Sequence, residues 1–218
     1  MINNLKNKFS VSHLQNIIEG MGHTFFTKGN YNVNIIGVRN PNLVANSFDD
    51  TMLCAFKVAG QWVLKEWEIT TDAGKYWLKN PMNAKGCALL VPHQYRGVYK
   101  IDEHLGKYTA LCQRLGKVEV YRDDNKDQIL DFNVTKEWGM FGINIHRSNP
   151  WSESHNVDKW SAGCQVFKKV ADFDEFMDIC KRANDNWGNS FTYTLIKEEE
   201  KNLLYIIYIN QNQQNERY

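Results

Sequence analysis

The chain has 218 residues and a formal net charge of +1, so it is long enough to bury a full hydrophobic core in one large domain. Its balanced charge provides neither the basic surface typical of nucleic-acid binding nor a polybasic membrane patch. The longest apolar runs are too short to span a bilayer. We therefore expect no nucleic-acid partner and no membrane insertion. The sequence does not indicate an oligomeric state.

The first fifteen residues, MINNLKNKFSVSHLQ, lack the apolar core of a secretory signal. We therefore expect the protein to be made in the cytoplasm without a signal peptide. The five cysteines are scattered and contain no CxxC pair, which favours free thiols over a zinc site or a redox dithiol. We expect no metal and no cofactor.

In chain order, Ser10 or Ser12 is expected to cap a helix over residues 13–21, in which Leu14, Ile17 and Ile18 share one face. A β-rich stretch follows from residue 31. Segments 51–60 and 61–70 flank a turn at Ala59 and Gly60, which predicts a hairpin.

Short apolar or aromatic runs bounded by turn residues continue the β pattern, and we predict strands within 75–80, 87–92, 97–101, 108–113, 117–122 and 141–147. Residues 171–185 switch to helical period. A hairpin is expected over 191–209, around the charged run Lys197–Lys201, before a polar tail. The predicted class is α+β, mainly β. Its parts are an N-terminal elaboration (1–49), a main domain (50–210) and the tail (211–218).

Two segments suggest chemistry. GINIHRSN ends an apolar run on His146, and WSAGCQVF places Cys164 after Ala162 and Gly163. Cysteine attacks as the thiolate, so a nearby imidazole would serve as its base. Gly163 allows a sharp turn whose amides can act as an oxyanion hole, and Ser161 can hydrogen-bond within that turn. The alternative is a core histidine and a core thiol.

A gap of fourteen residues separates His146 from Ser161, Ala162, Gly163 and Cys164. This pattern resembles the signature of the L,D-transpeptidase catalytic domain (YkuD-like), a histidine followed by Ser/Thr-His-Gly-Cys. EITTDAGKYWL is similar to an upstream stretch of that family, and the resemblance covers roughly residues 50–170. Ala162 stands where the family has its second histidine, and Asp72-Ala73 stands where it has Thr-Pro.

The resemblance implies a β-sandwich core, with an N-terminal helix and with a helix and hairpin after the cysteine. It also implies a cysteine enzyme that cuts or exchanges peptide bonds of peptidoglycan stem peptides through a thioester. Carried over by position, Cys164 is the nucleophile, His146 is the base, and the amides near Gly163 and Cys164 form the oxyanion site. Backbone near Arg147 would orient the imidazole.

Further residues are candidates for binding substrate. Arg147 and Arg96 suit a substrate carboxylate because guanidinium groups bind carboxylates through two parallel hydrogen bonds, and Tyr95 lies beside Arg96 in the sequence. Residues 147–160 are expected to form a lid with Trp151 and Trp160 as walls. The acidic run 123–131 resembles a calcium loop but has Gln128 at the glycine position, which favours an acidic turn.

Without an export signal, hydrolysis of stem peptides, as by a carboxypeptidase, endopeptidase or lysin, is favoured over cross-linking. Such an enzyme would reach the cell wall after release at lysis or as a virion component. The Asn- and Lys-rich composition is compatible with a phage source. A true L,D-transpeptidase and a catalytically silent binding or virion module remain alternatives.

Overall fold

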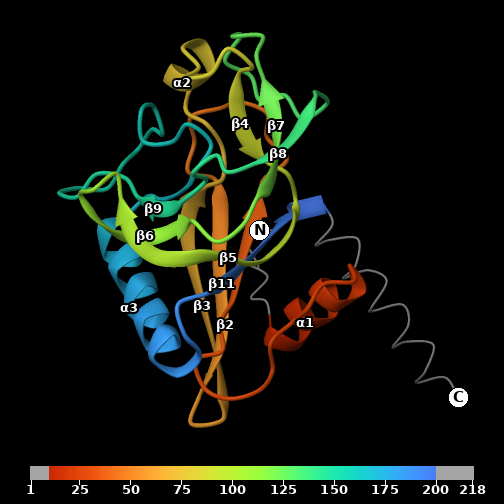
Figure 1. The fold of residues 1–218 in the computed structure, drawn as a ribbon, viewed down its shortest axis with the longest axis vertical. Helices are drawn as coiled ribbons and strands as arrows, with labels where there is room; N and C mark the ends of the chain where they lie inside the picture. Colours follow the sequence, from red (N-terminus) through yellow and green to blue (C-terminus); the bar gives the residue numbers. More distant parts are fainter. Residues whose placement is uncertain (1–9, 200–218) are drawn as a thin grey trace, which may run out of the picture.

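The computed structural model describes residues 10–199, which form an α+β structure that is mainly β (Figure 1). The helices are α1 (Val11–Gly20), α2 (Lys75–Lys79) and α3 (Val170–Trp187). The first six strands are β1 (Asn34–Arg39), β2 (Asp50–Val58), β3 (Gln61–Thr70), β4 (Cys87–Leu90), β5 (His93–His104) and β6 (Tyr108–Gln113). The other five are β7 (Val118–Asp123), β8 (Lys136–Gly139), β9 (Ile145–Arg147), β10 (Gln165–Phe167) and β11 (Phe191–Lys197). None of the helices in this part of the chain is long and apolar enough to cross a membrane.

The main sheet closes into a barrel in the order β1-β11-β5-β6-β9-β10-β3-β2, and β4, β7 and β8 form a separate three-stranded sheet. The small sheet lies at the end of the barrel that carries α2, at the top of Figure 1. A sandwich of two packed sheets was predicted. The barrel closes instead because short β10 pairs with β9 on one side and with β3 on the other.

Several predicted elements are confirmed. Ser10 caps α1 by accepting a hydrogen bond from the His13 backbone N–H. β2 and β3 pair along their whole length around the turn at Ala59 and Gly60, which both have positive φ, as a two-residue hairpin turn requires. α3 covers the predicted helical segment.

Residues 75–80 were predicted as a strand, but most of them form the short helix α2. The aromatic residues that suggested a strand lie in a helical turn that buries only Leu78. β8 was not predicted, because its four residues are mostly polar or exposed. The second arm of the predicted C-terminal hairpin and the polar tail lie outside the described residues.

The core divides at the barrel wall. The largest apolar cluster combines the barrel interior with α3, through Phe173, Phe176 and Met177. A second cluster packs α1 against the outer face of β1, β2 and β11, and Figure 1 shows α1 and α3 on opposite sides of the barrel. β1 is therefore buried on both faces: Ile35 belongs to the first cluster and Ile36 to the second. Although β1 lies inside the predicted elaboration 1–49, it is a barrel strand.

Candidate active site

The turn before Cys164 is held by its own hydrogen bonds. The Gly163 N–H donates to Ser161 Oγ (3.1 Å), and Ser161 Oγ donates to the Cys164 carbonyl (3.0 Å). Gly163 has φ +123°, and a Cβ there would overlap the Ala88 carbonyl oxygen. Only glycine fits this position, because both the backbone conformation and the space exclude a side chain.

The two segments that carried the family resemblance lie side by side. Ala73 forms an antiparallel bridge with Ala162, and the Gly74 N–H donates to the Ser161 carbonyl (2.9 Å). A Cβ at Gly74 would overlap the backbone of Asp158. The upstream stretch therefore supports the turn that presents Cys164.

Strand pairing brings His146 close to the segment that carries Cys164. β9 and β10 are parallel, and His146 is the partner of Val166. Cys164 lies immediately before β10 and packs against the cluster that contains Val166, so it lies toward the same face. The opposite face carries Gln165, whose Oε1 accepts a hydrogen bond from the buried Tyr193 hydroxyl in the barrel interior.

The His146 ring is fixed through Nδ1, which lies 2.8 Å from the Arg147 carbonyl oxygen and 3.2 Å from the Tyr108 hydroxyl. A carbonyl oxygen only accepts, so Nδ1 carries the proton and Nε2 has the free lone pair. Nε2 has no hydrogen-bond partner among residues 10–199. The solvent-inaccessible side-chain atoms without a partner in that region are Tyr99 Oη and Asp123 Oδ1, so Nε2 is not one of them. The unprotonated nitrogen therefore remains open to a small group.

A second histidine stacks on the first. The rings of His104 and His146 have centroids 4.1 Å apart and are inclined by 21°. Asn144 Nδ2 donates to His104 Nδ1 (3.0 Å), since that amide nitrogen cannot accept. Burial, reinforced by His104, lowers the pKa of His146 to about 3, and burial lowers the pKa of His104 to about 4. Both rings are neutral at pH 7.

The Cys164 sulfur accepts a hydrogen bond from the Asn144 backbone N–H (3.4 Å) and donates one to the Gly142 carbonyl (3.5 Å). No hydrogen bond joins it to the His146 ring in the described part of the chain. Gln113 Oε1 holds the neighbouring loop by accepting from three successive amides, those of residues 141–143. Burial raises the pKa of the Cys164 thiol to about 11, so the resting sulfur is protonated.

The half-buried Cys164 opens onto a cavity of about 330 Å³ between the small sheet and the 140–144 loop. Its lining residues include Met82, Cys87, Arg122, Phe141, Gly142 and Cys164. The Gly163 N–H was expected to be an oxyanion donor, but it already donates to Ser161 Oγ and is not free. The Cys164 N–H makes no hydrogen bond to another described residue and is the donor that remains.

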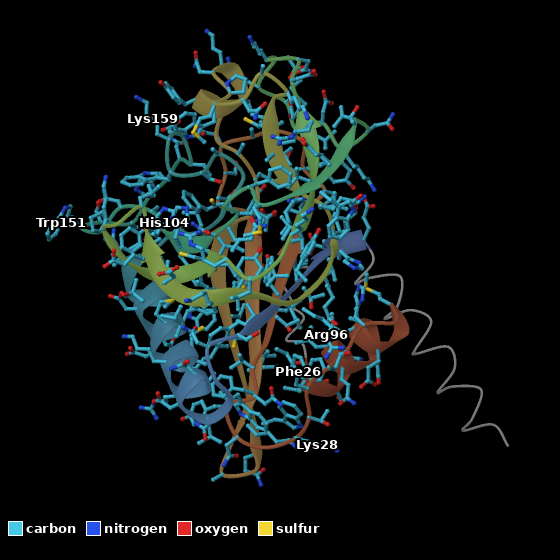
Figure 2. The ribbon with its side chains drawn as sticks, in the orientation of Figure 1. Phe26, Lys28, Arg96, His104, Trp151 and Lys159 are labelled. Atoms are coloured by element: carbon cyan, nitrogen blue, oxygen red, sulfur yellow. The ribbon has the colours of Figure 1, made fainter. Side chains whose placement is uncertain are left out.

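The four predicted substrate-binding side chains lie outside this cavity. The Arg147 guanidinium stacks on Tyr108, 4.0 Å from the ring centroid. Tyr95 is buried, and its hydroxyl donates to the Val91 carbonyl (2.7 Å). Arg96 is exposed on the side of the molecule that carries α1, away from His104 (Figure 2). Trp160 is 40% exposed.

The excursion expected to form a lid does not close over the cavity. Trp151 is 91% exposed, and it projects away from the molecule at the left of Figure 2. Neither Trp151 nor Trp160 lines the cavity. The excursion instead meets the rest of the structure through Asn46, whose Oδ1 accepts from the Asp158 backbone N–H (2.6 Å).

Residues 124–129 of the acidic run 123–131 form a mostly exposed turn, in which Asn125 Nδ2 donates to Asp127 (2.9 Å) and Asp131 (2.6 Å). Residues 10–199 contain no group of three or more carboxylate, imidazole or thiol side chains placed to hold a metal ion.

Sequence reasoning missed His104, Asn144 and Arg122. No local pattern marks His104, because its stacking on His146 depends on the pairing of β5 with β6 and of β6 with β9. The other two carried a local signal. Asn144 is a polar residue between Ile143 and Ile145, and Arg122 shares a strand face with Val118 and Val120.

Comparisons of the chain with protein-family models, with curated proteins and with solved structures found no match.

Proposed function

We propose that this protein is a cysteine-dependent enzyme of L,D-transpeptidase type that cleaves peptide bonds of peptidoglycan stem peptides. The observation that carries the proposal is the state of His146. Its Nδ1 is bonded to the Arg147 carbonyl, and its Nε2 is unpaired on the strand face that also carries Cys164. His146 is a base held in one tautomer on the strand that pairs with β10, and Cys164, immediately before β10, lines an open cavity. This arrangement supports covalent catalysis.

In the proposed reaction, the Cys164 side chain turns from the Gly142 carbonyl toward His146, and Nε2 takes the thiol proton as sulfur bonds to the substrate carbonyl carbon. The oxyanion that forms accepts a hydrogen bond from the Cys164 N–H. As the intermediate collapses, the C–N bond breaks and the imidazolium returns its proton to the leaving amine. Water then attacks the thioester, which releases a carboxylic acid and restores the thiol.

The choice of stem peptides rests on the resemblance of the His146 and Ser161–Cys164 pattern and of the stretch Glu68–Leu78. The adjacency of these two segments in the fold supports it. Hydrolysis is proposed over cross-linking, and the protein would act on the cell wall after release at lysis or as a virion component.

Digestion of purified sacculi followed by mass spectrometry of the products tests the proposal. We expect shortened stem peptides from the wild-type chain and from Cys87→Ala, a matched control that removes the other thiol of the cavity. Cys164→Ala and His146→Ala should release none. An added D-amino acid acceptor would become incorporated if the enzyme is a transpeptidase. Equal products from wild type and Cys164→Ala would refute the enzyme.

A second candidate is a catalytically silent binding module. The observation that favours it is the resting thiol, whose pKa is raised to about 11 by burial and whose proton points to a backbone carbonyl. Such a module would bind sacculi equally well with and without Cys164 and leave their composition unchanged, which the same digestion would reveal.

A further inference from the structure

We propose that Arg122 binds a free carboxylate of the substrate in the cavity of Cys164. That Arg122 recognises a substrate rests on the function proposed above, whereas its binding of an anion does not. The substrate would then be an acyl-donor peptide with a free carboxylate close to the scissile carbonyl.

The Arg122 guanidinium is fixed in place. Nε donates to Glu137 Oε2 (2.8 Å), Nη1 donates to the Gly86 carbonyl (3.4 Å), and the group lies 4.6 Å from the centroid of the Phe141 ring. A guanidinium held in this way loses little freedom when it binds a carboxylate.

One nitrogen of this group is unused. Nη2 donates to no described residue, although Arg122 is only 9% exposed. The sealed side-chain atoms without a partner are Tyr99 Oη and Asp123 Oδ1 in the described part of the chain. Nη2 is therefore reached from outside the protein. Because Arg122 lines the cavity, a ligand there lies within reach of its guanidinium group.

The local charge favours an anion. Glu137, the carboxylate partner of Arg122, is shared with Lys85 (3.1 Å), so two cations face one anion. Asp123 follows Arg122 on β7 and points to the opposite face, where its Oδ2 accepts from the Asp131 N–H (3.1 Å). Asp123 does not line the cavity.

The bound anion would lie close to the reacting sulfur. Phe141 stacks on Arg122, and the carbonyl of the next residue, Gly142, accepts the Cys164 thiol. Both groups therefore lie along one short wall of a cavity of about 330 Å³. That geometry suits a carboxylate about one residue from the carbonyl under attack.

Paired thiol reagents test this without any peptidoglycan. N-iodoacetylglycine carries a carboxylate and N-iodoacetylglycinamide does not, while both transfer their acyl-methylene group to sulfur as the C–I bond breaks, iodide leaves and the thiol proton passes to solvent. Peptide mass spectrometry gives the alkylation rate of each reagent at Cys164, and the ratio of the two rates is divided by the same ratio for a free thiol. The thiolate fraction of Cys164 does not affect this ratio, because it enters both rates equally. We expect a preference of about tenfold for the carboxylate.

Arg122→Gln should lower this preference to that of the free thiol. Arg96→Gln, the same change on a distant surface, should retain it, and Arg122→Lys should keep part of it. A ratio equal to that of the free thiol in the wild-type chain, or one unchanged in Arg122→Gln, would overturn the proposal.

A second readout does not need a reactive sulfur. In Cys164→Ala, N-acetylglycine should raise the unfolding temperature more than N-acetylglycinamide does, and adding Arg122→Gln should remove the difference. If the two compounds raise the unfolding temperature of Cys164→Ala equally, the proposal is overturned. Failure of sacculus digestion alone would refute the enzyme but leave the anion site standing.

Discussion

At the scale of single residues, Cys164 and His146 are both uncharged at rest near neutral pH. Cys164 keeps its proton because burial raises the pKa of the thiol, and His146 stays neutral because burial and the stacked His104 lower the pKa of the imidazole. A thiolate–imidazolium ion pair is therefore not the resting state. In the proposed reaction, the thiol proton therefore moves to Nε2 as the sulfur attacks.

The resting thiol predicts how Cys164 reacts with iodoacetamide. Only the thiolate is alkylated, and with a pKa of about 11 the rate should rise about tenfold per pH unit from pH 7 to 9. Peptide mass spectrometry gives the rate at this cysteine. A rate that levels off near neutral pH would show that the ion pair exists at rest.

Acid stability tests the stacked histidines. The pKa of each ring is lower in the folded chain than its usual value of 6.5, so the unfolded chain binds more protons and the fold loses stability as the pH falls below about 6.5. His104→Phe keeps a stacked ring without a titrating group. Between pH 7 and 5 it should lose about 1–2 kcal/mol less than the wild-type chain in urea unfolding. Equal losses would contradict the lowered pKa of His104.

A substitution at Gly163 tests the turn that presents Cys164. Gly163→Ala adds a Cβ that overlaps the Ala88 carbonyl and also imposes positive φ on alanine, so we expect a loss of roughly 2–4 kcal/mol in stability. Gly60→Ala is the control, because Gly60 also has positive φ but has open space around its Cβ position. It should cost only about 1 kcal/mol. Similar losses in both variants would mean that Ala88 does not confine the turn.

At the scale of elements, a buried ionic cluster joins β1, β2 and the segment after β3. Arg39 Nε lies 3.1 Å from Asp72, and Arg39 Nη2 donates to the Thr71 carbonyl (2.9 Å). Asp50 accepts from the Asn40 (2.7 Å) and Thr71 (2.6 Å) backbone N–H groups. Because Thr71 and Asp72 lead directly to the bridge at Ala73, this cluster anchors the segment that supports the turn before Cys164.

Removing the cation of this cluster should be costly. Burial raises the pKa of both carboxyl groups, that of Asp50 to about 8, and Arg39 opposes the rise. Arg39→Met removes the positive charge that stabilises the buried carboxylates. We expect the free energy of unfolding, measured in urea, to fall by roughly 3–5 kcal/mol. Since raised pKa values favour the protonated fold, the loss should grow as the pH rises. A loss that does not change between pH 6 and 8 would contradict this.

The control is an exposed pair of similar geometry. Lys65 and Glu175 lie 2.6 Å apart with 40% and 45% of their side chains exposed. Lys65→Met should therefore cost less than about 1 kcal/mol.

At the scale of the whole molecule, local patterns predicted most elements but not how they close. Helical period revealed α1 and α3, and the Ala59-Gly60 turn revealed the β2–β3 hairpin, because those signals lie within a few residues of sequence. The barrel depends on long-range pairing of strands as short as β9 and β10. Because β1 is buried on both faces, its sequence does not alternate apolar and polar residues and does not indicate which face points into the barrel.

The site follows the same division. Adjacent residues predicted the Ser161–Cys164 turn, and the resemblance implied that backbone near Arg147 orients the imidazole. The structure contains both contacts. His104 lies at the end of β5, Asn144 just before β9 and Arg122 on β7, so their proximity depends on the completed fold. Arg147, Arg96 and Trp160 had the expected chemistry, but strand direction and the course of the excursion put them elsewhere.

The most direct measurement of the central claim is intact-protein mass spectrometry of the chain quenched in acid during turnover of a soluble stem peptide. We predict an added mass equal to the acyl part of the cleaved peptide, located on Cys164 and removed by hydroxylamine, as a thioester requires. The adduct should be absent from Cys164→Ala and retained in Cys87→Ala. Peptide cleavage that continues in Cys164→Ala, or a wild-type chain that forms neither adduct nor product, would contradict the account.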